Sequence, residues 1–241
     1  MKIYIVVLFL FLSVIAKSQM IDSLNTAKNA MYMTEAEREM IYEINRVRHE
    51  PVSYLQYLTP LLKEAQTNLK INGKGEPNYS LTYSSTTING KETKTIDTTW
   101  HYTNEEELRA ITTLINDLKK LKPLSILKPD KGIYNAAKKH AADQNNHEWT
   151  LLHTGSDGSK PWDRIKLFSP SMNFGNENIA GRYGYANTTP RDIVLQLLID
   201  SGIPGYGHRY NLLDPQWTHA GCRVEKYKGT WWWIQEFGVS R

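Results

Sequence analysis

The last strand-like segment of the chain has large aromatic side chains on both of its faces. Residues 230–237 read Thr-Trp-Trp-Trp-Ile-Gln-Glu-Phe, and successive side chains of a strand point to opposite sides of the sheet. Trp231 and Trp233 therefore share one face, and Trp232 points to the other. Such a strand needs cover on both sides. Because helix-like segments precede it, and residues 220–225 form a hairpin partner for it, we predict a layered α/β/α body.

The first 18 residues have the pattern of an export signal. Lys2 provides a positive start, residues 3–15 are almost all apolar, and Ala16-Lys17-Ser18 offers small residues for cleavage. The apolar run is shorter than the roughly 20 residues of a membrane span, although an uncleaved anchor is the alternative. We predict residues 1–18 as a signal peptide and 19–33 as an N-terminal arm. The mature chain then has no transmembrane segment and is secreted or periplasmic.

The charge and the cysteine content exclude two simple interpretations. Removing residues 1–18 deletes Lys2 and Lys17 and no acidic residue, so the formal net charge falls from +4 to +2. This balance is too mild to indicate a nucleic-acid partner. Cys222 is the only cysteine, so the chain cannot form an internal disulfide and depends on its hydrophobic core. Its apolar, strand-like surroundings predict a buried, inert thiol.

Several segments have the signals that begin a helix. A capping residue followed by apolar residues at helical spacing occurs at Thr34, Asn104, Asp130 and Thr189. Apolar residues at 54–62, around Pro60, predict a further short helix. Between these helices the composition becomes rich in Gly, Ser, Thr and Asn. We interpret residues of about 63–103 as an insertion that is mobile or forms a flap, with a small hairpin near residues 81–88.

Four ionisable residues lie at loops or at the ends of elements: His153, Glu177, Asp200 and His208. Asp200 falls in the last turn of a predicted helix, where a carboxylate opposes the helix dipole and needs a partner. His208 lies in residues 207–215, which the flanking glycine and proline predict to be a shaped loop. His140, in contrast, lies on a buried helical face, where we expect a core histidine rather than a ligand.

Five short motifs occur in the order typical of one family. They are Asn45-Arg46-Val47-Arg48, His153-Thr154-Gly155, Glu177-Asn178-Ile179-Ala180, Gly207-His208-Arg209 with Asn211-Leu212-Leu213, and Trp233-Ile234-Gln235-Glu236-Phe237-Gly238. With these motifs the chain resembles the CAP superfamily, which comprises cysteine-rich secretory proteins, antigen 5 and pathogenesis-related 1 proteins and is built on the SCP domain. The resemblance is greatest to the bacterial secreted members.

The resemblance implies a CAP domain over residues 34–241, with a three-layer α/β/α sandwich and a central, mainly antiparallel sheet. It also implies a broad cleft that holds two histidines and two acids. His153 and His208 would be the histidines and Glu177 the first acid. Asp200 stands near the position of the second acid, where the family has the longer glutamate. The disulfides of the animal and plant members are absent from this chain.

These residue types allow a metal site, a purely structural network or a catalytic site. His153 and His208 could bind a divalent metal such as zinc, with Glu177 as a third ligand or with the carboxylates orienting the rings. The four groups could instead satisfy one another as a structural network. We favour a secreted, non-catalytic binding module for a small ligand, lipid, glycan, peptide or partner protein. The alternative is a metal-dependent hydrolase in which the histidines hold the ion and Glu177 is the general base. A surface-acting accessory protein is a third possibility.

Overall fold

The computed structural model describes residues 23–88, 91–144, 153–183 and 188–240. The predicted signal peptide lies outside these residues. The chain divides into two compact units, here called the sheet unit (Met1–His49, Leu124–Ile193 and Pro215–Arg241) and the hairpin unit (Glu50–Pro123 and Val194–Asp214). No helix within the described residues is both long enough and apolar enough to cross a bilayer.

The sheet unit contains a four-stranded sheet with helices on both faces. Its elements are α2 (Glu35–His49), β3 (Lys128–Pro129), α5 (Lys131–Gln144), α6 (Pro161–Phe168), β4 (Met172–Tyr183), β5 (His219–Tyr227), β6 (Thr230–Ser240) and the start of α7 (Pro190–Ile199). The strand order is β3-β5-β6-β4. The β5–β6 and β4–β6 pairs are antiparallel, and only the two-residue β3 runs parallel to its neighbour, β5.

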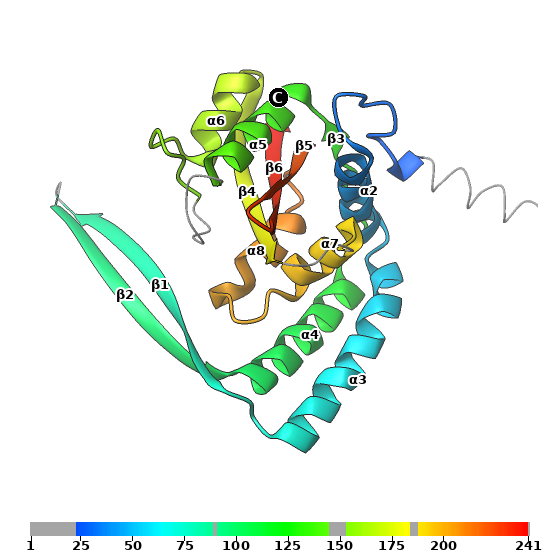
Figure 1. The fold of residues 1–241 in the computed structure, drawn as a ribbon, viewed down its shortest axis with the longest axis vertical. Coiled ribbons are helices and arrows are strands. Elements are labelled where there is room, and N and C mark those ends of the chain that lie inside the picture. The colour runs from blue at the N-terminus through cyan, green and yellow to red at the C-terminus, as the bar shows by residue number, and fades with distance from the viewer. Residues whose placement is uncertain (1–22, 89–90, 145–152, 184–187, 241) are drawn as a thin grey trace, which may run out of the picture. The chain divides into compact units, whose positions relative to one another are not determined.

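Two neighbouring residues of β6 show how the three layers are assembled. Ile234 packs with Ala137 and Ala141 of α5, while the adjacent Gln235 points the other way and its Nε2 donates to the sulfur of Met40 in α2, 3.1 Å away. Helices α5 and α6 thus cover one face of the sheet and α2 covers the other (Figure 1). This confirms the predicted α/β/α architecture with a mainly antiparallel sheet.

A glycine sets the distance between α5 and the sheet. A Cβ atom added at Gly221 of β5 would lie 2.2 Å from the backbone nitrogen of Tyr134 in α5. No side chain fits in that space. The helix and the strand therefore meet backbone against backbone, and this contact fixes the height at which the rest of α5 lies above the sheet.

The predicted helix starts are mostly confirmed. Thr34 and the Glu37 carboxylate form the expected capping box, in which the Thr34 backbone N–H donates to Oε2 at 2.7 Å. Asp130 accepts from the backbone N–H of Ile133 at 2.8 Å, and Thr189 exchanges hydrogen bonds with Asp192. Since each cap satisfies backbone donors that the first helical turn leaves unpaired, these local signals were sufficient to place the helices.

The hairpin unit contains a helix pair and a long two-stranded ribbon. Its elements are η1 (Pro51–Tyr54), α3 (Leu55–Asn72), β1 (Pro77–Ile88), β2 (Lys91–Tyr102), α4 (Thr103–Lys120), η2 (Pro204–Tyr206), α8 (Gly207–Leu212) and the end of α7. Helices α3 and α4 pack against each other, and the ribbon connects them (Figure 1).

Three local predictions for this unit were wrong. Helix α3 continues well past Pro60, because residues 63–72 favour helix, and it ends at Gly73 with φ of +66°. Helix α4 begins at Thr103 rather than after an Asn104 cap. The Asn104 side chain instead donates to the carbonyl of Gly73 at 3.0 Å. Residues 207–212, expected as a loop, form the short helix α8.

Candidate functional site

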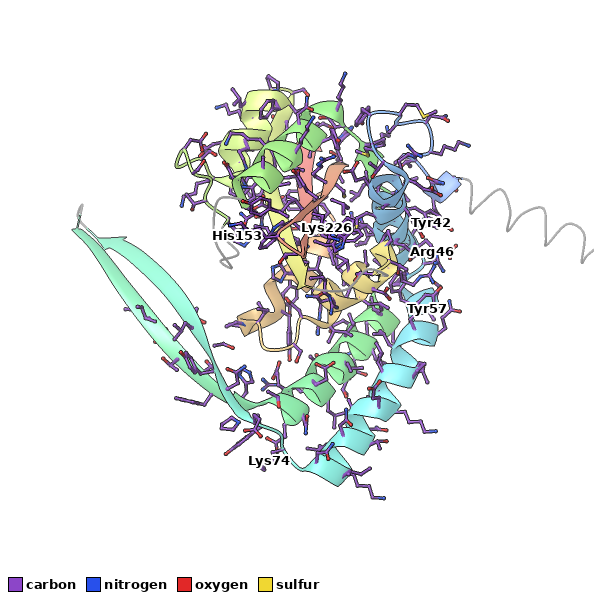
Figure 2. The ribbon with its side chains drawn as sticks, viewed as in Figure 1. Tyr42, Arg46, Tyr57, Lys74, His153 and Lys226 are labelled. Carbon is purple, nitrogen blue, oxygen red and sulfur yellow. The ribbon has the colours of Figure 1, made fainter. Side chains whose placement is uncertain are left out.

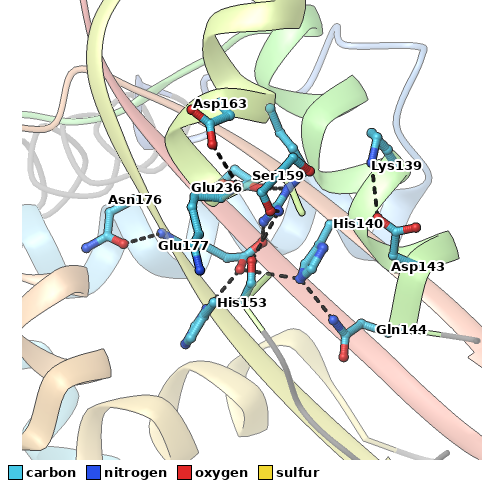
Figure 3. A network of polar contacts seen from close by, with 12 residues as sticks. Lys139, His140, Asp143, Gln144, His153, Ser159, Asp163, Asn176, Glu177 and Glu236 are labelled. Atoms are coloured by element: carbon cyan, nitrogen blue, oxygen red, sulfur yellow. Dashed lines mark hydrogen bonds and ion pairs between the residues drawn. The ribbon is translucent and has the colours of Figure 1, made fainter. Parts of the chain in front are cut away.

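His153 and Glu177 form a direct contact in the sheet unit. Nδ1 of His153 lies 2.9 Å from Oε1 of Glu177. The His153 side chain is 53% exposed, whereas the Glu177 side chain is fully buried. Figure 3 shows the imidazole at the margin of a polar cluster, with the carboxylate inside it. A buried acid thus holds the inner edge of a solvent-accessible imidazole.

Strand parity and one arginine place Glu177 in this cluster. In β4, Glu177 pairs with Glu236 of β6, on the sheet face that α5 and α6 cover. Arg164 of α6, itself fully buried, donates from Nη2 to Oε2 of Glu177 at 2.7 Å. Its Nη1 donates to the backbone carbonyls of His153 and Ser159, at 3.1 and 2.9 Å. Arg164 therefore fixes the acid and the loop that contains the histidine at the same time.

Two buried carboxyl groups share one guanidinium in this cluster. Nε of Arg164 lies 3.5 Å from Oε1 of the fully buried Glu236, so one guanidinium serves two carboxylates. Burial raises the pKa of Glu236 well above its usual value, and the neighbouring Glu177 charge raises it further while Arg164 opposes the shift. The arrangement favours the protonated form of Glu236.

His140 of α5 also belongs to the cluster. Its ring is fully buried, and its Nε2 lies 3.5 Å from Oε1 of Glu177 and 2.9 Å from Nε2 of Gln144 (Figure 3). The prediction of a buried histidine on this helix face is confirmed. Its position beside Glu177 was missed, because helical periodicity reports which face is buried but not which strand residue lies opposite.

Asp200 and His208 form a second contact, in the hairpin unit. Nδ1 of His208 lies 2.7 Å from Oδ1 of Asp200, and the His208 backbone N–H donates to Oδ2 at 2.9 Å. The side chains of His208 and Asp200 are 21% and 2% exposed, respectively. Asp200 follows the last residue of α7 with a left-handed φ of +56°, a conformation that aspartate tolerates better than most residues. The expectation that Asp200 needs a partner is confirmed.

A second buried arginine fixes the backbone next to Asp200. Arg209 donates from Nε to the carbonyl of Leu198 at 2.7 Å and from Nη2 to that of Ile199 at 3.0 Å, both at the end of α7. It also donates to the carbonyl of Ala110 in α4 at 2.8 Å. Arg209 directly follows His208 in the sequence. The arginine therefore holds the last residues of α7, while the histidine binds the carboxylate of Asp200, the residue after that helix.

The four predicted residues thus occur as two histidine–acid pairs, one in each unit. The convergence of the two pairs in a single cleft stays a prediction. Sequence reasoning missed Arg164 and Glu236, which complete the first pair. Their only signal is positional, since Glu236 lies in the closing strand and Arg164 in the turn-like helix after the His153 loop.

Both carboxylate oxygens of Glu177 have partners in this cluster. Oε1 faces His153 and His140, and Oε2 accepts from Arg164. In the parts of the chain that the structure describes, no group of three or more His, Cys, Asp or Glu side chains could hold a metal ion. The contact at Nδ1 is that of a carboxylate that orients an imidazole, and the role of Glu177 as a metal ligand stays a prediction.

Comparisons with known proteins place the chain in a family. The model of the cysteine-rich secretory protein family (CAP) matches residues 112–237, which is 126 of the 241 residues. No curated protein sequence matches significantly. Among solved structures, an outer surface protein from Borrelia burgdorferi is similar, with 22% identity and a TM-score of 0.41, over 57% of this chain and 95% of the other. An extracellular SCP-domain protein from Bacillus anthracis has 16% identity and a TM-score of 0.39, over 73% and 71% of the two chains. Because the family model covers more than half of its length, the chain belongs to the cysteine-rich secretory protein (CAP) family.

Proposed function

We propose that the protein is a secreted, non-catalytic binding module that contacts its ligand through His153 and His208. One observation supports this above the others: each imidazole is fixed through Nδ1 by a nearly buried carboxylate. An ionised carboxylate can only accept a hydrogen bond, so it holds the proton on Nδ1. The lone pair is then on Nε2, the nitrogen at the opposite edge of the ring.

Oriented imidazoles of this kind suit recognition of neutral donors. The hydroxyl groups of a glycan and the amide N–H groups of a peptide both donate to an imidazole lone pair. A ring that is already held in place loses less conformational entropy on binding than a mobile one. The chemistry of the pairs therefore supports a glycan or peptide ligand.

A divalent metal is a second candidate ligand for the same nitrogens. Carboxylate–histidine pairs are the usual support of metal-bound imidazoles. Zinc sites in proteins generally use three or four protein ligands, and without Glu177 the two histidines supply only two. Two imidazoles alone should therefore bind zinc weakly.

The hydrolase alternative has less support. A general base must reach the proton that it removes, at about 2.6–3.2 Å or through one water. The Glu177 side chain is fully buried, and its second oxygen is engaged by Arg164. This environment suits a fixed orienting charge better than proton abstraction from solvent.

The secreted location rests on residues 1–18 of the sequence. Expression of the whole chain with its natural N-terminus should give a mature product in the culture medium or the periplasm. N-terminal sequencing of that product should begin near Gln19. A cell-associated product that keeps residues 1–18 would contradict this part of the proposal.

The compounds that copurify with the exported protein test the binding proposal. We would purify the mature chain, extract it for lipids and glycans, and identify the extract by mass spectrometry, alongside His153→Ala and His208→Ala variants. The expected result is a compound enriched in the wild type and lost from both variants. Calorimetric titration with zinc on the same proteins tests the metal. Equal binding of every ligand by wild type and variants would remove the imidazoles from the proposal.

A further variant, Glu177→Gln, distinguishes binding from hydrolysis. If the protein hydrolyses an ester, peptide or glycoside substrate, the proposed base predicts that Glu177→Gln abolishes the activity without loss of fold. Metal-dependent hydrolysis with that sensitivity would favour the alternative over the binding module.

A further inference from the structure

The ribbon formed by β1 and β2 is a sheet without further strands. Its register is continuous, from Pro77 opposite Tyr102 to Ile88 opposite Lys91, with no bulge. Among the described residues no third strand pairs with either strand. A two-stranded ribbon is only marginally stable in water unless more strands or a packed face support it. A ribbon of two 12-residue strands should therefore gain stability by pairing with further strands.

One face of the ribbon is apolar and exposed. Tyr79 lies opposite Trp100, and their rings are 5.3 Å apart. Since strand residues two apart share a face, Leu81 and Ile96 lie on the same side. The side chains of Tyr79, Trp100, Leu81 and Ile96 are 52%, 70%, 39% and 59% exposed, respectively. At the base of the ribbon, Lys74 lies over the ring of Tyr102, 5.3 Å from its centroid (Figure 2).

The opposite face is polar and is anchored to its own unit. The hydroxyl of Ser80 donates to the carbonyl of Gly202 at 2.6 Å, beside η2. The ribbon is therefore fixed by its polar face, and the aromatic face is directed away from that anchor.

The two edges of the ribbon differ in charge. Residues 77–88, which form β1, include no charged residue and are mostly Tyr, Ser, Thr and Leu, types that favour strands or tolerate them. Strand β2 contains Lys91, Glu92, Lys94 and Asp97. Charged residues, bulges and prolines are the usual means by which proteins prevent edge-to-edge pairing. After its first residue, Pro77, β1 has none of them.

We propose that β1 pairs antiparallel with β1 of a second copy of the chain, so that two ribbons form one four-stranded sheet. A two-fold axis perpendicular to the sheet would bring residues of the same parity opposite each other, which places both aromatic faces on one side. Because β1 is uncharged, self-pairing creates no like-charge contact. Pairing through β2 would place the charged residues of that strand in the new edge contact, which opposes such pairing.

The size of this contact sets its strength. Twelve residues at about 3.3 Å each give an edge of roughly 40 Å, and a sheet about 10 Å thick gives roughly 400 Å² per partner. Stable interfaces bury about 800 Å² per partner. The dimer is therefore weak and forms with increasing protein concentration.

Sedimentation equilibrium of the mature protein is the first test. The expected result is a monomer at low micromolar concentration that shifts toward a dimer at several hundred micromolar. Thr82→Lys on β1 should shift the equilibrium back to the monomer. Thr99→Lys adds the same charge to the same polar face but on β2, and it should leave the dimer unchanged. A monomer at every concentration, or equal effects of the two variants, would overturn the proposal.

Cysteine cross-linking identifies the paired edge directly. Cys222 is buried, and burial raises the pKa of its thiol far above the usual value, so it does not compete with an introduced thiol. In antiparallel self-pairing only residues at the two-fold axis meet their own copies, at Cα distances that permit a disulfide. Single-cysteine variants along β1 should therefore cross-link at one or two adjacent positions. Thr98→Cys and Thr99→Cys on β2 should not cross-link. Cross-linking from β2, from every second position of β1, or from none would contradict the arrangement.

Discussion

The two histidine–acid pairs make the same contact but hold their acids in different ways. Glu177 lies in the middle of a strand and depends on the side chain of Arg164 for its second oxygen. Asp200 lies beyond a helix end and accepts a backbone N–H from the residue whose ring it also binds. Arg209, the buried arginine of the second pair, binds backbone carbonyls of α7 rather than the acid.

The two pairs therefore fix the orientation of an imidazole in two different ways. In the sheet unit the acid is a buried charge, stable only while its guanidinium partner is present. In the hairpin unit the acid is part of a local backbone turn, so its orientation depends on conformation more than on charge. The first pair should therefore respond to changes in charge and pH, and the second to changes in backbone preference.

The largest effect should come from removing the guanidinium of the first pair. Arg164→Met leaves Glu177 and Glu236 buried without a cation, and breaking a buried pair typically costs about 3–5 kcal/mol. Urea unfolding would measure this loss, and adding Glu177→Gln should recover part of it. Lys74→Met is a control, since Lys74 pairs with Glu105 and both side chains are exposed, at 63% and 43%, so its loss should be no more than about 1 kcal/mol. Equal losses for both variants would show that the first pair is not a charge-dependent site.

The second pair should respond to the backbone conformation of its acid. Asp200→Ala loses two hydrogen bonds and places a less tolerant residue at a φ of +56°, for an expected loss of about 2–3 kcal/mol. Asp200→Asn keeps an acceptor and a residue type that tolerates the left-handed region, and should lose less than half as much. The comparison is made by urea unfolding at neutral pH. If alanine and asparagine destabilise equally, conformation is not what holds this pair.

The first pair should also make the stability depend on pH. The pKa of Glu236 is raised in the folded protein, so between about 4.5 and that raised value the folded state binds more protons than the unfolded state. Its contribution to stability is fully present below about 4.5 and is lost as the pH rises through the folded pKa. Urea midpoints measured across that range should fall for the wild type and fall less for Glu236→Gln. Parallel profiles would contradict the assignment of the proton to Glu236.

The smallest effect on stability should come from the exposed imidazole itself. His153→Ala removes a side chain that is 53% exposed and leaves Glu177 bound to Arg164, so we expect a loss below about 1 kcal/mol. Thermal unfolding would measure it. A loss as large as that of Arg164→Met would mean that His153 is a structural member of the cluster rather than a group presented to a ligand.

Local sequence signals predicted much of the fold. Caps at Thr34, Asp130 and Thr189 act within one turn of their own helix, and the Trp-rich strand required cover on both faces. Longer-range features could not be read in this way. The contact of Arg164 with Glu177 joins a helix to a strand, and no spacing rule connects the two. The pairing of Glu177 with Glu236 depends on a strand register that the sequence leaves open.

The errors at α8 and α3 have a related cause. Helix α8 has only six residues, too few for intrinsic propensity to determine its structure, and tertiary contacts such as those of Arg209 decide it. For α3, the apolar residues at 54–62 predicted only a short helix, yet the helix-favouring residues that follow extend it to Asn72. In both places the prediction gave too little weight to the neighbouring residues.

The close approach at Gly221 has a consequence for how the family scaffold can vary. Even a methyl group at this position would collide with the backbone of α5, so any larger residue would push the helix away from the strand. That movement would also shift His140, which lies on α5, relative to the strand that bears Glu177. A saturation library at position 221 should therefore recover glycine almost alone, although the residue belongs to neither histidine–acid pair. The exclusion of other residues would show that Gly221 helps to fix the position of the His140 ring.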